Sequence, residues 1–284
     1  MRRYGVTPLL CIWLLLQIPC IRSYDEIETQ LQRFWRHSNA VLDTSNQCIR
    51  ESLQFANEAA EDVWLTNFVK SVPEGGGGGV TLPRMKATVI LSKAALVLPI
   101  IGDLVETGVN TGTSSCLMMR MMMRFDNCNR RLWAFDSFEG LPKPTGEDGV
   151  WGMGAHKGQM AVSQELFETN MKRWGAWNET RIVVTKGFFN ETLPSSNIGK
   201  ISFLRLDGDL FASTWDALTN LYHKVVPGGY IYVDDFGSFE GCREAIDSFR
   251  TKHHIYEPLH FVREENQVKY IMFEAVWWQK RLVA

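Results

Sequence analysis

The segment Leu204-Arg205-Leu206-Asp207-Gly208-Asp209 decides the fold, because an apolar run that starts at Ile201 ends there on two acids that flank a glycine. A short apolar run with this ending is typical of a buried parallel strand whose carboxyl end opens toward solvent. The pattern recurs in three more predicted strands: 102–106, ending on Glu106; 131–135, followed by Asp136; and 230–233, followed by Asp234 and Asp235. We therefore expect acidic side chains to gather at one edge of a sheet.

Helical segments separate these strands. Apolar spacing predicts helices over residues 85–98, 113–125, 163–174, 214–223 and 240–251. Further strands are predicted at 181–185, 269–274 and 276–278. Strands that alternate with helices of this length predict an α/β fold, a doubly wound Rossmann-like sheet with helices on both faces. Right-handed crossovers bring the carboxyl ends of its parallel strands, and so the acids, to the edge where such folds bind ligands.

The N-terminus departs from the globular pattern. Arg2 and Arg3 precede an apolar run that ends before Ser23, and its length of about fifteen residues is short for a membrane span. Residues 1–23 are therefore predicted to be a secretory signal peptide or a short signal anchor. The protein would enter the secretory pathway or be secreted, or stay anchored in an endomembrane if the segment is retained. Asn178 and Asn190 begin glycosylation sequons, which agree with this route.

The chain before the main domain divides into two parts. Residues 24–74 are predicted to form a helical appendage, and the run Gly75–Gly79 opens a flexible linker over residues 75–81. The main domain is then residues 82–284. The appendage either packs on that domain or serves as a lid or a dimerisation arm, which leaves a homo-oligomer open.

Composition excludes several classes of protein. With 45% hydrophobic and 22% charged residues, the chain is globular rather than coiled coil or disordered. A net charge of -2 leaves no basic excess for a phosphate backbone, so no nucleic-acid partner is expected. The cysteines are too widely spaced for a zinc site, and Cys116, within an apolar helix, is predicted to be a buried thiol.

The first predicted strand runs into the turn from Glu106 to Gly112, which has the form E-x-G-x-x-x-G. Glycines after a strand let a ligand approach the backbone, and the next helix offers free N–H groups. A dinucleotide site would instead have G-x-G-x-x-G around a pyrophosphate, which a carboxylate repels. The turn favours a cationic group, such as the sulfonium of S-adenosylmethionine, and argues against a nicotinamide-dependent oxidoreductase.

The other acids predict a nucleoside site and a metal site. Asp136, at the end of the second strand, can accept hydrogen bonds from both hydroxyls of a ribose. Asp207, Asp234 and Asp235 follow strands that would be neighbours, and three carboxylates without histidine or cysteine favour Mg²⁺, with Ca²⁺ or Mn²⁺ as alternatives. The remaining alternative is a surface cluster of acids. Asp209 is predicted not to bind the metal directly, but to contact its ligands or to cap a helix.

With these residues, the chain resembles the macrocin-O-methyltransferase-like (TylF/MycF-type) class I methyltransferases over about residues 82–280. The matching strings lie at Asp103–Val109, Asp136–Pro142, Lys186–Phe188, Thr192–Pro194, Leu204–Leu210, Pro227–Gly237 and Gly241–Phe249. The chain departs from the family at Asn110-Thr111, where relatives usually have Trp-Arg-Gly, and residues 1–80 do not match.

The resemblance implies Mg²⁺-dependent methylation, by S-adenosylmethionine, of a hydroxyl on a small molecule, often a sugar of a natural product. The implied cofactor contacts are Glu106, Thr107, Gly108 and Gly112 at the methionine end, Asp136 with Ser137 and Phe138 at the ribose, and Gly187 and Phe188 at the adenine. The implied metal ligands are Asp207, Asp234 and Asp235.

Methyl transfer needs a deprotonated hydroxyl in line with the sulfonium. A metal on these aspartates would lower the pKa of the hydroxyl, and one of them, such as Asp207 or Asp234, or a metal-bound hydroxide would take the proton. His156, in the loop after the second strand, is the side-chain base to test first. A different kind of function also remains open: the chain could be a secreted protein without catalytic activity that uses the same Rossmann-like fold as an interaction module.

Overall fold

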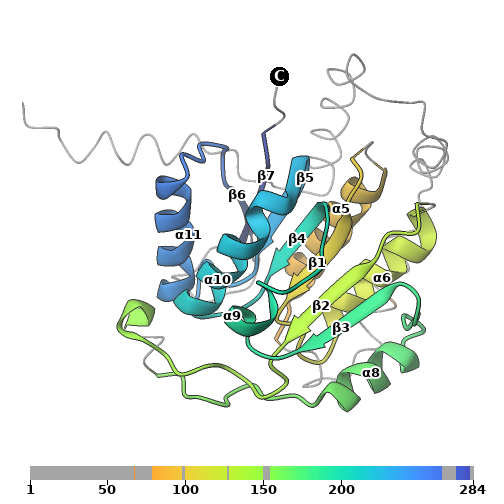
Figure 1. The fold of residues 1–284 in the computed structure, drawn as a ribbon, viewed down its shortest axis with the longest axis horizontal. Coiled ribbons are helices and arrows are strands. Elements are labelled where there is room, and N and C mark those ends of the chain that lie inside the picture. The colour runs from red at the N-terminus through yellow and green to blue at the C-terminus, as the bar shows by residue number, and fades with distance from the viewer. Residues whose placement is uncertain are drawn as a thin grey trace, which may run out of the picture.

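The computed structural model describes residues 67, 79–97, 100–126, 128–149, 154–263 and 273–281. Its core is a seven-stranded sheet in the order β3-β2-β1-β4-β5-β7-β6 (Figure 1). The strands are β1 (Asp103–Thr107), β2 (Leu132–Asp136), β3 (Ile182–Lys186), β4 (Ile201–Leu206), β5 (Val225–Val233), β6 (His260–Arg263) and β7 (Phe273–Gln279). Five strands are parallel, whereas β7 pairs antiparallel with β5 and β6 antiparallel with β7.

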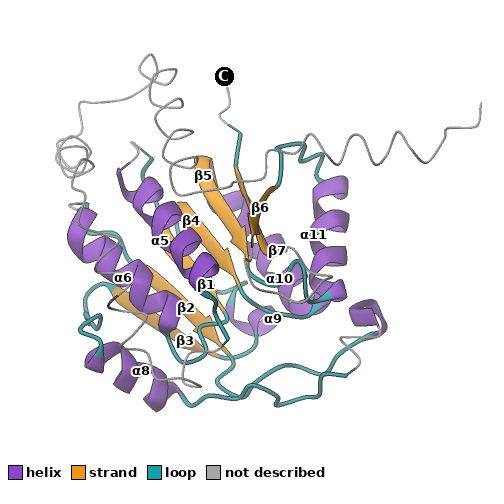
Figure 2. Ribbon diagram, turned by 180° about the vertical axis from the view of Figure 1, so that it is seen from behind, coloured by secondary structure: helices purple, strands orange, loops and turns teal. Residues whose placement is uncertain are grey.

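The helices cover both faces of the sheet. Their bounds are α5 (Leu82–Val97), α6 (Thr113–Phe125), α8 (Gln164–Arg173), α9 (Phe189–Thr192), α10 (Phe211–Leu221) and α11 (Glu240–Lys252). Helices α9, α10 and α11 lie in front of the sheet in Figure 1, and α5, α6 and α8 lie in front of it in the opposite view of Figure 2. The fold is therefore the doubly wound, Rossmann-like α/β architecture that the sequence predicts.

Two apolar cores form because neighbouring side chains on a strand point to opposite faces. Leu104 and Phe203 pack with residues of α5, α6 and α8, whereas Val105 and Leu204 pack with residues of α10 and α11. A strand that is covered on both faces must be apolar on both, which explains the continuous apolar runs in the sequence. Cys116, on α6, is a buried free thiol as predicted.

The C-terminal part of the sheet differs from the prediction. Glu274 and the segment 276–278 belong to one strand, β7, rather than to two. Strand β6 was not predicted, because His260–Arg263 is short and mixes charged with apolar residues at a sheet edge. Strand β5 also begins earlier than predicted, at Val225, and so includes Pro227.

The predicted leader (residues 1–23) and almost all of the predicted appendage (residues 24–74) lie outside the described residues, as does most of the glycine-rich linker. Within the described part of the chain, none of the helices has the length and apolar character that crossing a bilayer requires.

Candidate active site

The predicted acids do meet at one edge of the sheet. Strands β2, β1, β4 and β5 are consecutive neighbours, so Asp136, Glu106, Asp207 and Asp234 follow one another along their carboxyl ends. Beside this edge lies a cavity of about 280 Å³. Its wall includes Arg84, Gly108, Asn110, Asp136, Ser137, Phe188, Asp207, Asp209, Asp234, Asp235, Ser238, Phe239 and Glu274.

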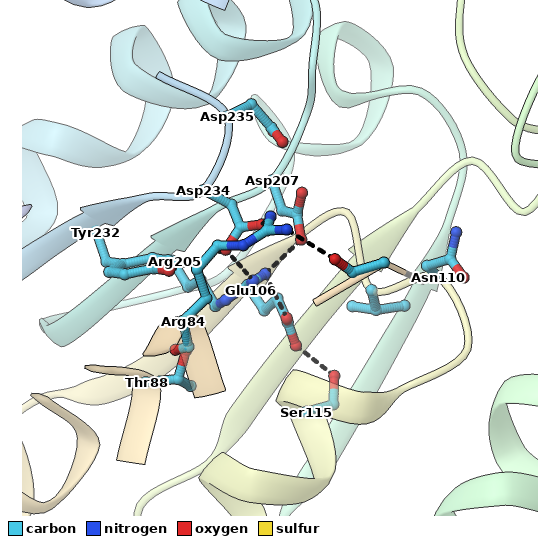
Figure 3. Close-up of polar contacts among 12 residues, drawn as sticks. Arg84, Thr88, Glu106, Asn110, Ser115, Arg205, Asp207, Tyr232, Asp234 and Asp235 are labelled. Atoms are coloured by element: carbon cyan, nitrogen blue, oxygen red, sulfur yellow. Dashed lines mark hydrogen bonds and ion pairs between the residues drawn. The ribbon is translucent and has the colours of Figure 1, made fainter. Parts of the chain in front are cut away.

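A buried arginine holds the acids of three strands together. Arg205, on β4, has no exposed surface, and its Nη1 donates to Glu106 Oε1 at 3.0 Å and to Asp207 Oδ2 at 2.6 Å. Its Nη2 donates to Asp234 Oδ1 at 2.6 Å (Figure 3). Arg205 thus supplies one positive charge from within the sheet, which offsets part of the repulsion among these acids.

The network places Glu106 below the cavity rather than on its wall. The Glu106 side chain is fully buried, and it accepts hydrogen bonds from Arg205 and from the Ser115 hydroxyl on α6 (Figure 3). The predicted contact of Glu106 with a cofactor is thus not one that this geometry provides. Its carboxylate instead anchors Arg205 and the start of α6.

Burial dominates the ionisation of this cluster. Burial raises the pKa of Glu106 to about 8, although Arg205 and the Ser115 hydroxyl lower it. Burial also raises the pKa of Asp207, as does the neighbouring Asp234. For Arg205, burial alone would lower the pKa, but the surrounding carboxylates together raise it well above its usual value. Arg205 is therefore always charged.

Asp207, Asp234 and Asp235 form a candidate metal centre. One carboxylate oxygen from each lies within 4.8 Å of the others, and all the donors are oxygens, which suits a hard divalent cation. Asp207 uses Oδ2 for Arg205, and Asp235 uses Oδ2 to accept from the Asp209 amide at 3.1 Å. Three carboxylates this close together, with oxygen donors alone, form a donor set that fits Mg²⁺.

Asp136 organises the loop at the other end of the cavity. Its Oδ2 accepts hydrogen bonds from the amides of Val109 (2.9 Å) and Asn110 (3.0 Å), and its Oδ1 accepts one from the amide of Phe138 (2.8 Å). Asp136 and Ser137 both line the cavity. The carboxylate is thus fixed, at the wall of the cavity, by the loops that follow β1 and β2.

The two glycines of the first turn serve packing. A Cβ on Gly108 would lie 1.7 Å from the Asp207 carbonyl oxygen, and one on Gly112 would lie 3.0 Å from the Phe167 ring. Both glycines have positive φ. Gly108 also lines the cavity, but Gly112 does not, so the geometry supports a ligand contact for Gly108 alone.

Among the other predicted cofactor residues, the structure brings Phe188 to the cavity wall. Thr107 and Phe138 are buried and are not part of that wall. Gly187, with a φ of 140°, packs against Thr192. These three residues pack behind the cavity wall and do not line it.

His156 is not brought to the site. Its side chain is exposed, and its Nδ1 lies 3.3 Å from the Lys157 carbonyl oxygen. It is not among the residues that line the cavity. The prediction of His156 as a catalytic base rested only on its position in the loop after β2. In the structure this loop places His156 at the surface, away from the cavity wall.

Sequence reasoning missed the role of Asp209. The Asp209 side chain does not cap α10. The residue lines the cavity, in a left-handed conformation with φ 57°, and its amide donates to the carboxylate of Asp235. Burial, together with Asp207 and Asp234, raises its pKa to about 8. The amide of Phe211, in the first turn of α10, instead donates to Asp148 Oδ1 at 2.6 Å. The signal in the sequence was the second acid of Asp207-Gly208-Asp209.

Comparisons with known proteins identify the family of the chain. The model of the macrocin-O-methyltransferase (TylF) family matches residues 73–280. The chain belongs to the macrocin-O-methyltransferase (TylF) family. It is 40% identical over 185 residues to demethyldecarbamoylnovobiocin O-methyltransferase of Streptomyces niveus, covering 63% of this chain and 66% of that protein. The stretch matched is thus just under two thirds of that relative's length.

Two further proteins extend the family comparison. The chain is 31% identical to mycinamicin III 3''-O-methyltransferase of Micromonospora griseorubida, over 63% of this chain and 68% of that protein. The solved structure of the O-methyltransferase NovP superposes with a TM-score of 0.67 at 28% identity, covering 78% of this chain and 99% of NovP. The family assignment predicted from the sequence motifs is therefore confirmed.

Proposed function

We propose that this protein is an S-adenosylmethionine-dependent O-methyltransferase that acts on a hydroxyl of a small molecule, a sugar or another natural product, with the help of Mg²⁺. The observation that carries the proposal is one cavity with two separate sets of acids. Asp136 lies at one end, and Asp207, Asp234 and Asp235 lie at the other. The two relatives reported above, whose names describe methylation of novobiocin-type and mycinamicin-type compounds, support the substrate class.

The methyl donor is assigned to the end of the cavity at Asp136. The Asp136 carboxylate would accept hydrogen bonds from the two ribose hydroxyls, as an acid at the end of this strand does in related folds. Phe188, on the same wall, offers an apolar surface beside the adenine. Gly108 also lines the cavity, and it follows β1, between the strands that end at Asp136 and at Asp207. The sulfonium would lie beside it.

The acceptor is assigned to the other end of the cavity. A divalent ion held by Asp207, Asp234 and Asp235 would orient the acceptor hydroxyl and lower its pKa. Asp209 is better placed than His156 to take the proton, because Asp209 lines the same cavity and His156 does not. Ser238 and Phe239, on the same wall, offer polar and apolar contacts to the rest of the acceptor.

The direct test uses the purified chain with isotopically labelled S-adenosylmethionine, MgCl₂ and extracts rich in hydroxylated metabolites, analysed by mass spectrometry. The expected result is a labelled methyl group on the oxygen of a small molecule, and loss of labelling when EDTA is added. No labelled product with any acceptor would contradict the enzyme activity. Unchanged turnover in EDTA would contradict the metal requirement alone.

Asp136→Ala is expected to weaken S-adenosylmethionine binding by about 10-fold to 100-fold, because charge-assisted hydrogen bonds to the ribose hydroxyls are lost. Isothermal titration calorimetry measures the change. Glu139→Gln is the matched control, since Glu139 is an exposed acid on the same loop and its loss should leave the affinity unchanged. Equal affinity of wild type and Asp136→Ala would contradict the ribose role.

We also propose that the protein enters the secretory pathway, because of the basic and apolar segment at residues 1–23 and the sequons at Asn178 and Asn190. Asn190 is exposed, and Asn178 is half-buried beside the exposed Thr180. Full-length protein expressed in eukaryotic cells is expected to lose mass on treatment with peptide N-glycosidase, and Asn178→Gln with Asn190→Gln is expected to abolish that loss. Cytosolic protein of unmodified mass would contradict the route.

A further inference from the structure

A second arginine reaches the candidate metal centre from outside the sheet. Arg84 lies in the first turn of α5, and its side chain is 11% exposed. Its Nη1 lies 2.5 Å from Asp234 Oδ2, and its Nη2 donates to the carbonyl oxygen of Gly79 at 2.7 Å. Figure 3 shows the guanidinium extended toward Asp234 and Asp207. Arg84 thus connects the segment that enters α5 to the acids of β4 and β5.

Arg84 completes the set of donors around Asp234. Oδ1 of Asp234 accepts from Arg205 Nη2 at 2.6 Å and from the Tyr232 hydroxyl at 2.9 Å. Oδ2 of Asp234 is the oxygen that Arg84 contacts. Both oxygens of this buried carboxylate are therefore engaged by donors. Among the described residues, Asp207 and Asp235 each have a hydrogen-bond donor at one oxygen only. A divalent ion that binds Asp234 must displace one donor or approach a bound guanidinium closely.

The two arginines differ in how easily they can yield. Arg205 is fully buried and donates to three carboxylates, so moving it would leave buried acids without a partner, which is strongly unfavourable. Arg84 lies on the wall of the cavity. Its long side chain comes from the first turn of α5. Arg84 is therefore the cation that can leave Asp234 while the network inside the sheet stays intact.

We propose that Arg84 is a positioning residue that competes with the divalent ion for Asp234 and so sets the metal affinity of the site. This inference rests on the proposed metal requirement. With Arg84 in place, a second cation at Asp234 Oδ2 meets electrostatic repulsion in a site shielded from water. When the ion binds, the guanidinium moves off Asp234 and its contact with Gly79 is broken or rearranged. Metal binding is thereby coupled to the segment that leads into α5.

Calorimetric titration of the metal-stripped full chain with MgCl₂ tests the competition. Arg84→Gln is expected to bind Mg²⁺ at least about 10-fold more tightly than wild type, since a charge-assisted contact no longer has to be broken. Arg84→Lys keeps the charge and is expected to stay close to wild type. Lys86→Gln removes a positive charge from the same helix at a residue that does not line the cavity, and should leave the affinity unchanged.

The outcomes separate the two proposals. Equal or weaker Mg²⁺ binding by Arg84→Gln, with measurable binding by wild type, overturns the competition but leaves the metal site standing. Absence of Mg²⁺ binding in both proteins overturns the metal requirement, and the inference with it. If Lys86→Gln raises the Mg²⁺ affinity as much as Arg84→Gln does, the gain comes from the change in net charge alone, and the inference is overturned.

Hydrogen exchange on the wild-type chain provides a test that needs no variant. MgCl₂ is expected to speed amide exchange in the peptide that contains Gly79, Val80 and Thr81, because the Arg84 contact with the Gly79 carbonyl is released. Exchange in β3, away from the centre, should not change. Unaltered exchange at residues 79–81 under saturating Mg²⁺ would contradict the movement of Arg84.

Discussion

Asp235→Asn is expected to lower methyl transfer by about 100-fold or more, because a metal ion that polarises the acceptor hydroxyl supplies several kcal/mol of barrier reduction. Asp235 is the cleanest of the three candidate ligands to replace, since no arginine contact to it is found among the described residues, whereas Asp207 and Asp234 both pair with Arg205. Turnover under saturating S-adenosylmethionine and MgCl₂, measured by mass spectrometry, gives the loss.

The same substitution should leave the fold intact. Burial, and then the neighbouring Asp209, Asp207 and Asp234, raise the pKa of Asp235 well above its usual value, so an amide replaces a carboxyl group that resists ionisation. Its side-chain oxygen can still accept from the Asp209 amide. We expect the melting temperature of the metal-free protein to be unchanged or higher. The matched control is Asp247→Asn, on the exposed side of α11, which should keep full activity; full activity in Asp235→Asn would contradict its role as a ligand.

Arg205→Met is expected to have the largest effect on stability, about 3–5 kcal/mol at neutral pH, because it leaves buried acids without their shared cation. Glu106, Asp207 and Asp234 all lose a hydrogen-bonded ion pair. Urea denaturation followed by circular dichroism measures the loss. Arg131→Met is the control, since Arg131 is exposed and its replacement should change the free energy of unfolding by less than about 0.5 kcal/mol.

The cost of Arg205→Met should depend on pH. The folded-state pKa of Glu106 is about 8, against an ordinary value of 4.5, and removal of Arg205 takes away an influence that lowers it. A carboxyl group with a raised folded-state pKa contributes stability that is complete below its unfolded pKa and is lost as the pH rises through the folded one. The stability difference from wild type should therefore be smaller at pH 5 than at pH 8. Equal stability of both proteins at pH 8 would contradict the role of Arg205.

Most of the fold could be predicted because its signals are local. The apolar run before Asp207 and the helical spacing before Phe125 each fix an element within a few residues of sequence. Strand β6 escaped because an edge strand with charged residues has no such signal. The acid positions were also predictable, since a carboxylate directly after a parallel strand must lie at the carboxyl edge of the sheet.

The partners of those acids were not predictable, because they come from distant parts of the chain. Arg84 is 150 positions from Asp234, and Arg205 is 99 from Glu106. A single sequence contains no local pattern for such pairs. Gly112 and His156 were misassigned to the site for the same reason. Gly112 packs against the ring of Phe167 on another helix, and His156 is turned toward solvent by the loop after β2.

The sequence by itself thus determined the α/β order, the family and the acids at the strand ends, because these follow from residues close together along the chain. Only the tertiary structure decided which acids face the cavity and which are held beneath it by Arg205. It also brought Asp209 to the cavity wall and Arg84 to the candidate metal centre. The physical reason is that the pairing and ionisation of a buried charge depend on everything that packs around it, and packing is set by the whole fold.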